Sequence, residues 1–207
     1  MLFITCFSLG FAIASLGSIT PSFLNMTVVK LTLKSGRNAA FFLIGGFATV
    51  LFFQANLGAY LSSVLMENSE YIEYIQILGT GILILLSVNF LRLYLTKKRR
   101  KRKQNIDSSK AYLHGIGMSL LNTFAVPFYF TTISFLIGLD YFQYSLLNGL
   151  YFSIGSTIGS FTLYAIYAIV ADKVEHRLEF VATRINLILA CLTGIAGIGN
   201  LFYLIQA

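Results

Sequence analysis

Apolar residues occupy the chain in long uninterrupted stretches rather than in short alternating segments. Six stretches contain no Asp, Glu, Lys or Arg, and each is 18 residues or longer: 1–29, 38–66, 74–91, 111–139, 141–171 and 185–207. A helix needs about 20 mostly apolar residues to cross a bilayer, whereas the strands of a membrane barrel are short and alternate. The pattern therefore predicts an all-α, polytopic membrane protein with six transmembrane helices.

Composition agrees with this prediction. The chain is 57% hydrophobic and only 11% charged, with a mean hydropathy of +0.76. Soluble domains carry about 25% charged residues, so these charges are too few to cover the surface of a water-soluble fold. The first stretch contains Ala12-Ile13-Ala14, which resembles a cleavage site for a signal peptide. No cation precedes it and the apolar residues continue past it, so we expect a retained span.

The distribution of cations predicts which connections face the cytoplasm. All 15 Lys and Arg residues lie at three alternate connections, within 30–37, 92–110 and 173–184. The charges at the other two connections are acidic: Glu67, Glu70 and Glu73 at one and Asp140 at the other. By the positive-inside rule the basic connections are cytoplasmic, so both termini are expected outside the membrane.

The densest basic segment is KKRRKRK, at 97–103. It lacks the aromatic or motif context of a nucleic-acid site, so we expect it to face lipid head groups instead and expect no nucleic-acid partner. The residues that we expect to anchor the topology are Arg37, Lys97, Lys98, Arg99, Arg100, Lys101, Arg102 and Lys103.

The same segment divides a single transmembrane domain, 1–207, into two parts. We expect a first half at 1–96, a cytoplasmic basic loop at 97–107 and a second half at 108–207. Each half has three spans, so the two halves are inverted relative to one another. Inverted repeats with broken helices near the midplane are characteristic of many secondary transporters.

Each half opens with a span that contains one of the chain's two prolines, Pro21 or Pro127. Proline removes a helical hydrogen bond, and in lipid the freed carbonyl must find another partner. We therefore expect a substrate path formed by Pro21, Ser22, Asn25, Gln54, Asn122, Thr123, Pro127 and Tyr129. Two other interpretations stay open: simple kinks at the prolines, and amides that bridge helices.

Residues on the later spans suggest packing. Gly155 and Gly159 have the small-residue spacing that lets helices approach closely. Ser153, Ser156, Thr157 and Ser160 share one stripe of the same predicted helix.

No charged residue lies deep in any span, which argues against a proton relay built on an intramembrane carboxylate. No catalytic set or metal-ligand cluster is evident, so we expect neither an enzyme nor a metal or other cofactor.

Several segments resemble the LysE/RhtB family of amino-acid exporters. They are GSITPSFLNMTVVKLTLKSGRNAAFFLIGGFATVL, IQILGTGILILLSVNFLRLY, HGIGMSLLNTFAVPFYF and RINLILACLTGIAGIGNLFYL. The family's Gly-x-Arg turn corresponds here to Ser35-Gly36-Arg37-Asn38. Its Pro-Gly-Pro break corresponds to Thr20-Pro21-Ser22, and its Asn-Pro-Lys-Ala block to Asn122-Thr123-Phe124-Ala125, with the proline displaced to Pro127.

The resemblance implies a secondary transporter in the inner membrane of a bacterium. It would export an amino acid or a similar small polar metabolite by alternating access, and assembly as a homo-oligomer is left open. A membrane thiol–disulfide electron carrier of the DsbD type is the alternative, because Cys6 lies in the first span. The other cysteine, Cys191, lies in the last span rather than in the fourth, where such a carrier needs it. A membrane scaffold that transports nothing is a third hypothesis.

Overall fold

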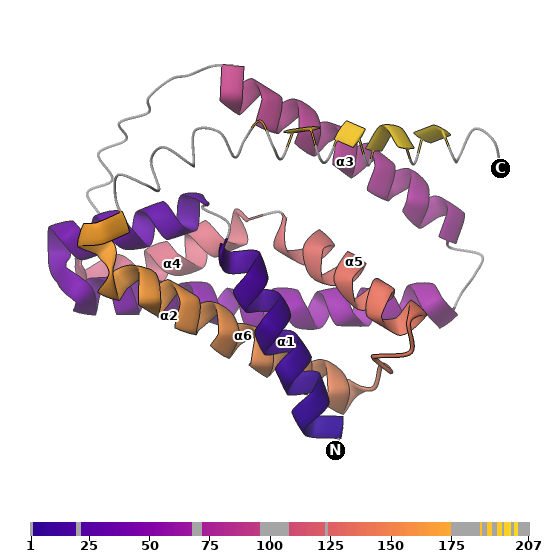
Figure 1. The fold of residues 1–207 in the computed structure, drawn as a ribbon, viewed down its shortest axis with the longest axis horizontal. Coiled ribbons are helices and arrows are strands. Elements are labelled where there is room, and N and C mark those ends of the chain that lie inside the picture. The colour runs from indigo at the N-terminus through magenta and orange to yellow at the C-terminus, as the bar shows by residue number, and fades with distance from the viewer. Residues whose placement is uncertain are drawn as a thin grey trace. The chain divides into compact units, whose positions relative to one another are not determined.

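The structure, a computed structural model, describes residues 2–19, 22–67, 72–95, 108–122 and 124–174, together with short stretches between 187 and 202. The helices are α1 (Leu2–Ile19), α2 (Phe23–Glu67), α3 (Ile72–Leu95), α4 (Ala111–Leu120), α5 (Ala125–Gly138) and α6 (Leu146–Ile169), with one 3₁₀ turn, η2 (Ser108–Lys110), before α4. All regular elements among the described residues are helical (Figure 1), so the all-α prediction is confirmed.

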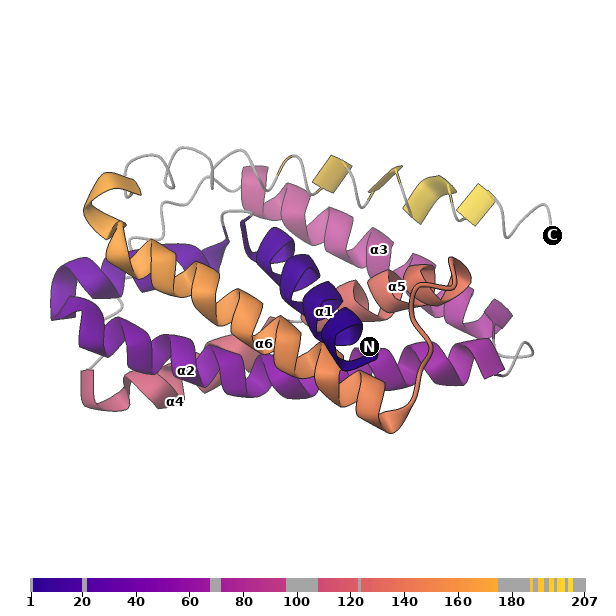
Figure 2. The ribbon, with the colours of Figure 1, turned by 60° about the horizontal axis from the view of Figure 1, so that its bottom comes forward.

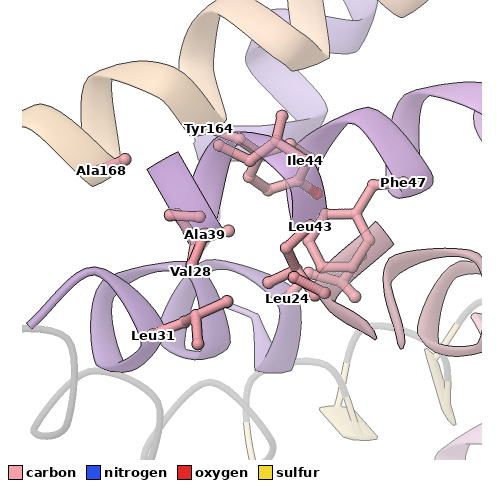
Figure 3. Close-up of a cluster of buried hydrophobic side chains, with 11 residues drawn as sticks. Leu24, Val28, Leu31, Ala39, Leu43, Ile44, Phe47, Tyr164 and Ala168 are labelled. Carbon is pink, nitrogen blue, oxygen red and sulfur yellow. The ribbon is translucent and has the colours of Figure 1, made fainter. Parts of the chain in front are cut away.

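The second helix, α2, folds back on itself at Gly36. Its 45 residues would extend about 68 Å as one straight helix, but Gly36 has φ 85° and ψ 168°, outside the helical range. One apolar cluster accordingly joins side chains from both sides of the bend (Figure 3): Leu24, Val28, Leu31, Leu43, Ile44 and Phe47. Glycine suits this corner because a positive φ is strained in other residues. We call 23–35 the first limb of α2 and 37–67 its second limb.

This bend confirms the turn expected at 35–38 and corrects its surroundings. The cations Lys30 and Lys34 lie in helical residues of the first limb, not on an extended loop, and Arg37 opens the second limb. The other seven expected topology anchors are the cations at 97–103, and they lie outside the described residues.

The leading span of each half is a broken helix. In the first half α1 ends at Ile19 and α2 begins at Phe23, which agrees with a break near Pro21; Pro21 itself lies outside the described residues. In the second half α4 ends at Leu120 and α5 begins at Ala125, and the two helices are bent by 59°. Helices of 10 and 14 residues are about 15 and 21 Å long, so neither alone crosses a hydrocarbon core of about 30 Å.

The second break lies before Pro127 rather than at it. Pro127 is the third residue of α5, where a backbone N–H has no partner within the helix and proline loses nothing. The chain turns instead at Asn122, whose N–H donates to the Ser119 carbonyl at 3.0 Å. The Asn122 carbonyl in turn accepts from the Ala125 N–H at 3.2 Å.

The chain forms two compact units, and each draws on both sides of the basic segment. Unit one comprises 1–66 and 105–176, and unit two comprises 67–104 and 177–207. Within unit two, the Ser87 hydroxyl of α3 donates to the Ala190 carbonyl at 2.8 Å. The halves expected at 1–96 and 108–207 stay a prediction.

Within unit one, α1 packs directly across α6, as Figures 1 and 2 show. Glycines on both helices permit this approach. A Cβ at Gly10 would overlap the Phe152 carbonyl, and one at Gly155 would overlap the Phe7 carbonyl. Gly159 meets the same restriction against α1, so the packing role predicted for Gly155 and Gly159 is confirmed.

Large apolar side chains cover the outside of the described helices. Leu121 is 81% exposed, Ile4 68% and Phe53 65%. Among the described residues, two helices are long and apolar enough to cross a membrane, Phe23–Leu65 and Leu146–Ile169. The bent pair of α4 and α5 would add a third if it forms one span. The arrangement of six spans in inverted halves stays a prediction.

Candidate functional site: a buried polar cluster at the first helix break

Seven polar side chains gather in the interior of unit one. They are Ser18 from α1, Ser22 immediately before α2, Asn25 from the first limb of α2, Tyr129 from α5, and Ser156, Ser160 and Tyr164 from α6. We call these residues the buried polar cluster. Asn25 and Ser156 are 0% exposed, and Tyr129 is 3% exposed. Tyr129 belongs to one apolar cluster of unit one and Tyr164 to the other, so these hydroxyl groups lie where the two apolar clusters meet.

Asn25 connects the two helix ends at the first break. Where a helix ends, its last carbonyls lose their intrahelical partners. The Asn25 side-chain amide donates to one of them, the Ser18 carbonyl, at 2.9 Å. Ser22, which immediately precedes α2, donates its hydroxyl to Asn25 Oδ1 at 2.6 Å and accepts from the Asn25 backbone N–H at 3.4 Å. The second contact is typical of a residue that caps a helix N-terminus.

Hydroxyl groups extend this connection from α1 to α6 and α5. The Oγ atoms of Ser18 and Ser160 lie 3.0 Å apart. The Tyr164 hydroxyl lies near that of Ser18, and the Tyr129 hydroxyl lies near that of Ser160. A second carbonyl at the end of α1, that of Ile19, accepts from the Tyr167 hydroxyl at 2.9 Å. The broken end of α1 is therefore hydrogen-bonded to two residues of α6, Ser160 and Tyr167.

The second limb of α2 fixes the position of Tyr129. A Cβ at Gly58 would lie 2.7 Å from the Tyr129 Cβ, so glycine allows α5 to approach this limb closely. One turn later, the Ser62 hydroxyl donates to the Phe130 carbonyl at 2.8 Å. These contacts hold α5 in the register that points Tyr129 toward Ser160.

One hydroxyl of the buried polar cluster lacks a partner. Ser156 Oγ is buried and makes no hydrogen bond of acceptable geometry among the described residues, although the Tyr129 hydroxyl is near enough to interact with it. A buried polar atom without a partner costs about 1–3 kcal/mol. Ser153, one turn earlier, pays no such cost because its hydroxyl donates to the Gly149 carbonyl of its own helix at 2.8 Å.

The second break is held by a side chain from a different helix. The Gln54 side-chain amide, on the second limb of α2, donates to the Ser119 carbonyl at the end of α4 at 3.1 Å. The Ser119 hydroxyl reaches back to the Phe47 carbonyl at 3.4 Å. Gln54 Oε1 is buried without a partner among the described residues. Gln54 is thus a bridge between helices, as one of the open interpretations expected.

Arg37 has a structural contact in addition to its expected place at the membrane surface. Its guanidinium donates to the Ile169 carbonyl, the last residue of α6, at 3.3 Å. A cation at this end of a helix satisfies an unpaired carbonyl and opposes the helix dipole.

The predicted substrate-path residues are found in two places. Ser22, Asn25 and Tyr129 belong to the buried polar cluster, whereas Gln54 and Asn122 lie at the second break. Pro127 lies in the first turn of α5, and Pro21 and Thr123 lie outside the described residues.

Four residues of the buried polar cluster were not among the predicted substrate-path residues: Ser18, Ser156, Ser160 and Tyr164. A usable signal existed for Tyr164, which follows Ser160 by one helical turn and extends the same stripe. The signal for Ser18 was its position three residues before Pro21.

The buried polar cluster is suited to hydrogen bonding and not to charge. Its groups are hydroxyls and one amide, all neutral donors or acceptors. Two open grooves lie on the outside of the described helices, one along α4 and one between α6 and the second limb of α2, and no residue of the cluster lines either. No group of three His, Cys, Asp or Glu side chains in the described part of the chain could hold a metal ion.

Comparison with known proteins gives one match. The family model of the LysE type translocator matches residues 15–203, which is most of the chain. No curated protein and no solved structure matches it. Together with the apolar helices, the family match indicates an integral membrane protein that acts as a transporter.

Proposed function

The chain belongs to the LysE type translocator family, and from this we propose that it is a secondary transporter that exports a small polar solute. The family resemblance favours an amino acid or a related metabolite. The observation that carries the proposal is the buried polar cluster, in which side chains of α1, α2, α5 and α6 meet at a helix break. Broken helices near the middle of the membrane are where transporters of this kind hold their solutes.

The proposed mechanism is alternating access between the two inverted halves. A solute entering from the cytoplasm exchanges the internal hydrogen bonds of Ser18, Asn25 and Tyr129 for bonds to its own polar groups. The broken helices let one end of a span move while the other stays packed. Gln54 and Asn122 at the second break, together with Thr123, supply hydrogen bonds in the second half. The driving force is an ion gradient or the gradient of the solute itself.

The orientation follows from the cations. We place the chain in the inner membrane of a bacterium, with residues 97–103 and Arg37 on the cytoplasmic side and both termini outside, because all 15 cations lie at alternate connections. Cysteine accessibility labelling at position 140 and within 97–103 tests this placement. Labelling of both positions from the same side of the membrane contradicts it.

A metabolite comparison tests the proposed export. Cells that overexpress the protein are compared with cells that lack it, and small solutes are quantified inside and outside by mass spectrometry. We expect at least one solute to shift outward with overexpression and to accumulate inside without the protein. Identical distributions in the two strains would sink the proposal.

The same assay separates transport from redox chemistry. Cys6 is buried in unit one, Cys191 is exposed in unit two, and both are free thiols. The double variant C6S/C191S should keep its export activity. If activity disappears while the protein stays folded, an electron carrier becomes the better explanation.

A further inference from the structure

The chemistry of the buried polar cluster limits what can bind there. Every residue of the buried polar cluster lies in one of the six stretches of the sequence that contain no Asp, Glu, Lys or Arg. A charged group that enters this interior therefore finds no side chain of opposite charge. Removing an unpaired ion from water costs several kcal/mol even after the protein relaxes.

Helix ends could in principle replace side-chain charges, because they carry partial charges of about half a unit. At the first break, however, three of these groups already have partners. The Ser18 and Ile19 carbonyls at the end of α1 accept from Asn25 and Tyr167. At the start of α2, the Asn25 N–H donates to Ser22. A charged group of a solute would have to displace these partners before it could bind the same helix ends.

Ser156 indicates what the cluster can accept instead. It is 0% exposed, lies near the Tyr129 hydroxyl, and has no hydrogen bond to its Oγ among the described residues. A neutral donor or acceptor on a solute would supply the missing partner at no cost in charge desolvation. Ser160 and Tyr129 lie beside it and can exchange their mutual interaction for bonds to the same group.

We propose that the buried polar cluster receives an uncharged, hydrogen-bonding part of the solute, with Ser156 as a direct ligand, and that solutes with a net charge are excluded. This inference rests on the proposed transport function and adds a solute class to it. In an amino acid, the uncharged part would be the side chain.

Isosteric solutes test the inference directly. Proteoliposomes are loaded with a metabolite extract to which asparagine, aspartate, leucine and 2,4-diaminobutyrate are added at equal concentration, and efflux of all components is measured. Asparagine, aspartate and leucine have side chains of nearly the same shape, so they differ mainly in charge and hydrogen bonding. We expect asparagine to leave at least about 10-fold faster than aspartate or diaminobutyrate, since charge desolvation costs more than one factor of ten.

Two serine variants give a matched comparison within α6. S156A should lower asparagine efflux about 5-fold or more, the loss of one neutral hydrogen bond, and should leave leucine efflux unchanged. S153A should change neither, because the Ser153 hydroxyl bonds only to its own helix. Thermal unfolding in detergent verifies that both variants fold.

The outcomes separate the two claims. Aspartate or diaminobutyrate efflux equal to that of asparagine overturns the solute class but leaves transport standing. Equal asparagine efflux from S156A and S153A overturns the role of Ser156. If no component of the extract leaves the vesicles faster than from protein-free vesicles, the proposed function fails and this inference fails with it.

Discussion

The two helix breaks of unit one are each bound by a side-chain amide, but the two amides come from different positions relative to the break. At each break a side-chain amide donates to the carbonyl of a serine near the end of the preceding helix: Asn25 to Ser18 at 2.9 Å, and Gln54 to Ser119 at 3.1 Å. The first amide comes from the helix that follows the break, and the second from a neighbouring helix. The first arrangement satisfies a backbone carbonyl that lipid cannot satisfy, whereas the Ser119 carbonyl also accepts from the Asn122 N–H.

The difference lies in how completely each amide is used. Both ends of the Asn25 amide have partners and the residue is fully buried, whereas Gln54 Oε1 is buried without a partner. The first break is also bound to α6 through Ser18, while at the second break Leu121 is 81% exposed. Among the described residues, the polar contacts of the first break therefore continue into α6, whereas those of the second break join α4 to the second limb of α2.

The largest effect is expected for N25A. The substitution removes the donor to the Ser18 carbonyl and the acceptor for Ser22, and it leaves a buried carbonyl unpaired. We expect a loss of about 2–4 kcal/mol in the free energy of unfolding and at least about a 10-fold loss of solute flux. Thermal unfolding in detergent and proteoliposome efflux measure the two quantities. If N25A is as stable as the wild type, the first break does not depend on the Asn25 amide, and the comparison between the two breaks fails.

A smaller effect is expected for Q54A. It removes one of two donors to the Ser119 carbonyl, which keeps the Asn122 N–H, and it also removes the unpaired Gln54 Oε1. We expect a loss of about 1 kcal/mol, measured by the same unfolding assay. A loss as large as that of N25A would show that the two breaks are equivalent.

The hydroxyl pair between Ser18 and Ser160 should show a measurable coupling. In a double-mutant cycle of S18A and S160A, we expect an interaction energy of about 0.5–1.5 kcal/mol, the net value of a hydrogen bond. The pair S18A and S153A serves as the control and should be additive. Additivity of S18A and S160A would mean that the first break is not bound to α6 through these hydroxyls.

The smallest effect is expected for P127A. Pro127 lies in the first turn of α5, after the bend, where its missing N–H has no intrahelical role. The free energy of unfolding should change by no more than about 1 kcal/mol, through the entropy of the unfolded chain. A larger destabilisation would indicate that Pro127, and not the turn at Asn122, causes the second break.

Much of this architecture could be predicted from the sequence, because long uncharged stretches and glycine spacing are local signals. The helices and the close packing at Gly155 follow from them, whereas the turn at Gly36 was expected from the family resemblance. The position of the second break could not be predicted in this way, because in a sequence a proline in the first turn of a helix resembles a proline at a kink.

Membership of the buried polar cluster was harder to predict for a physical reason. In a soluble helix the apolar stripe marks the inward face, but here apolar residues face both the core and the outside. Leu16 and Ile19 are 66% and 51% exposed, while Ala14 on the same helix is buried. Without that contrast, the inward direction of Ser18 and Tyr164 could not be derived from residue types alone.

Solute efflux from proteoliposomes that contain Y129F tests the central claim most directly. The substitution removes one hydroxyl of the buried polar cluster and keeps the ring that packs against Phe152. Y151F is the matched control, because Tyr151 lies on α6 outside the cluster and its ring packs against Phe3. The account predicts that Y129F lowers efflux of the exported solute at least about 5-fold, while Y151F retains the wild-type rate. Equal, wild-type efflux from both folded variants would contradict the claim that the solute passes through the cluster.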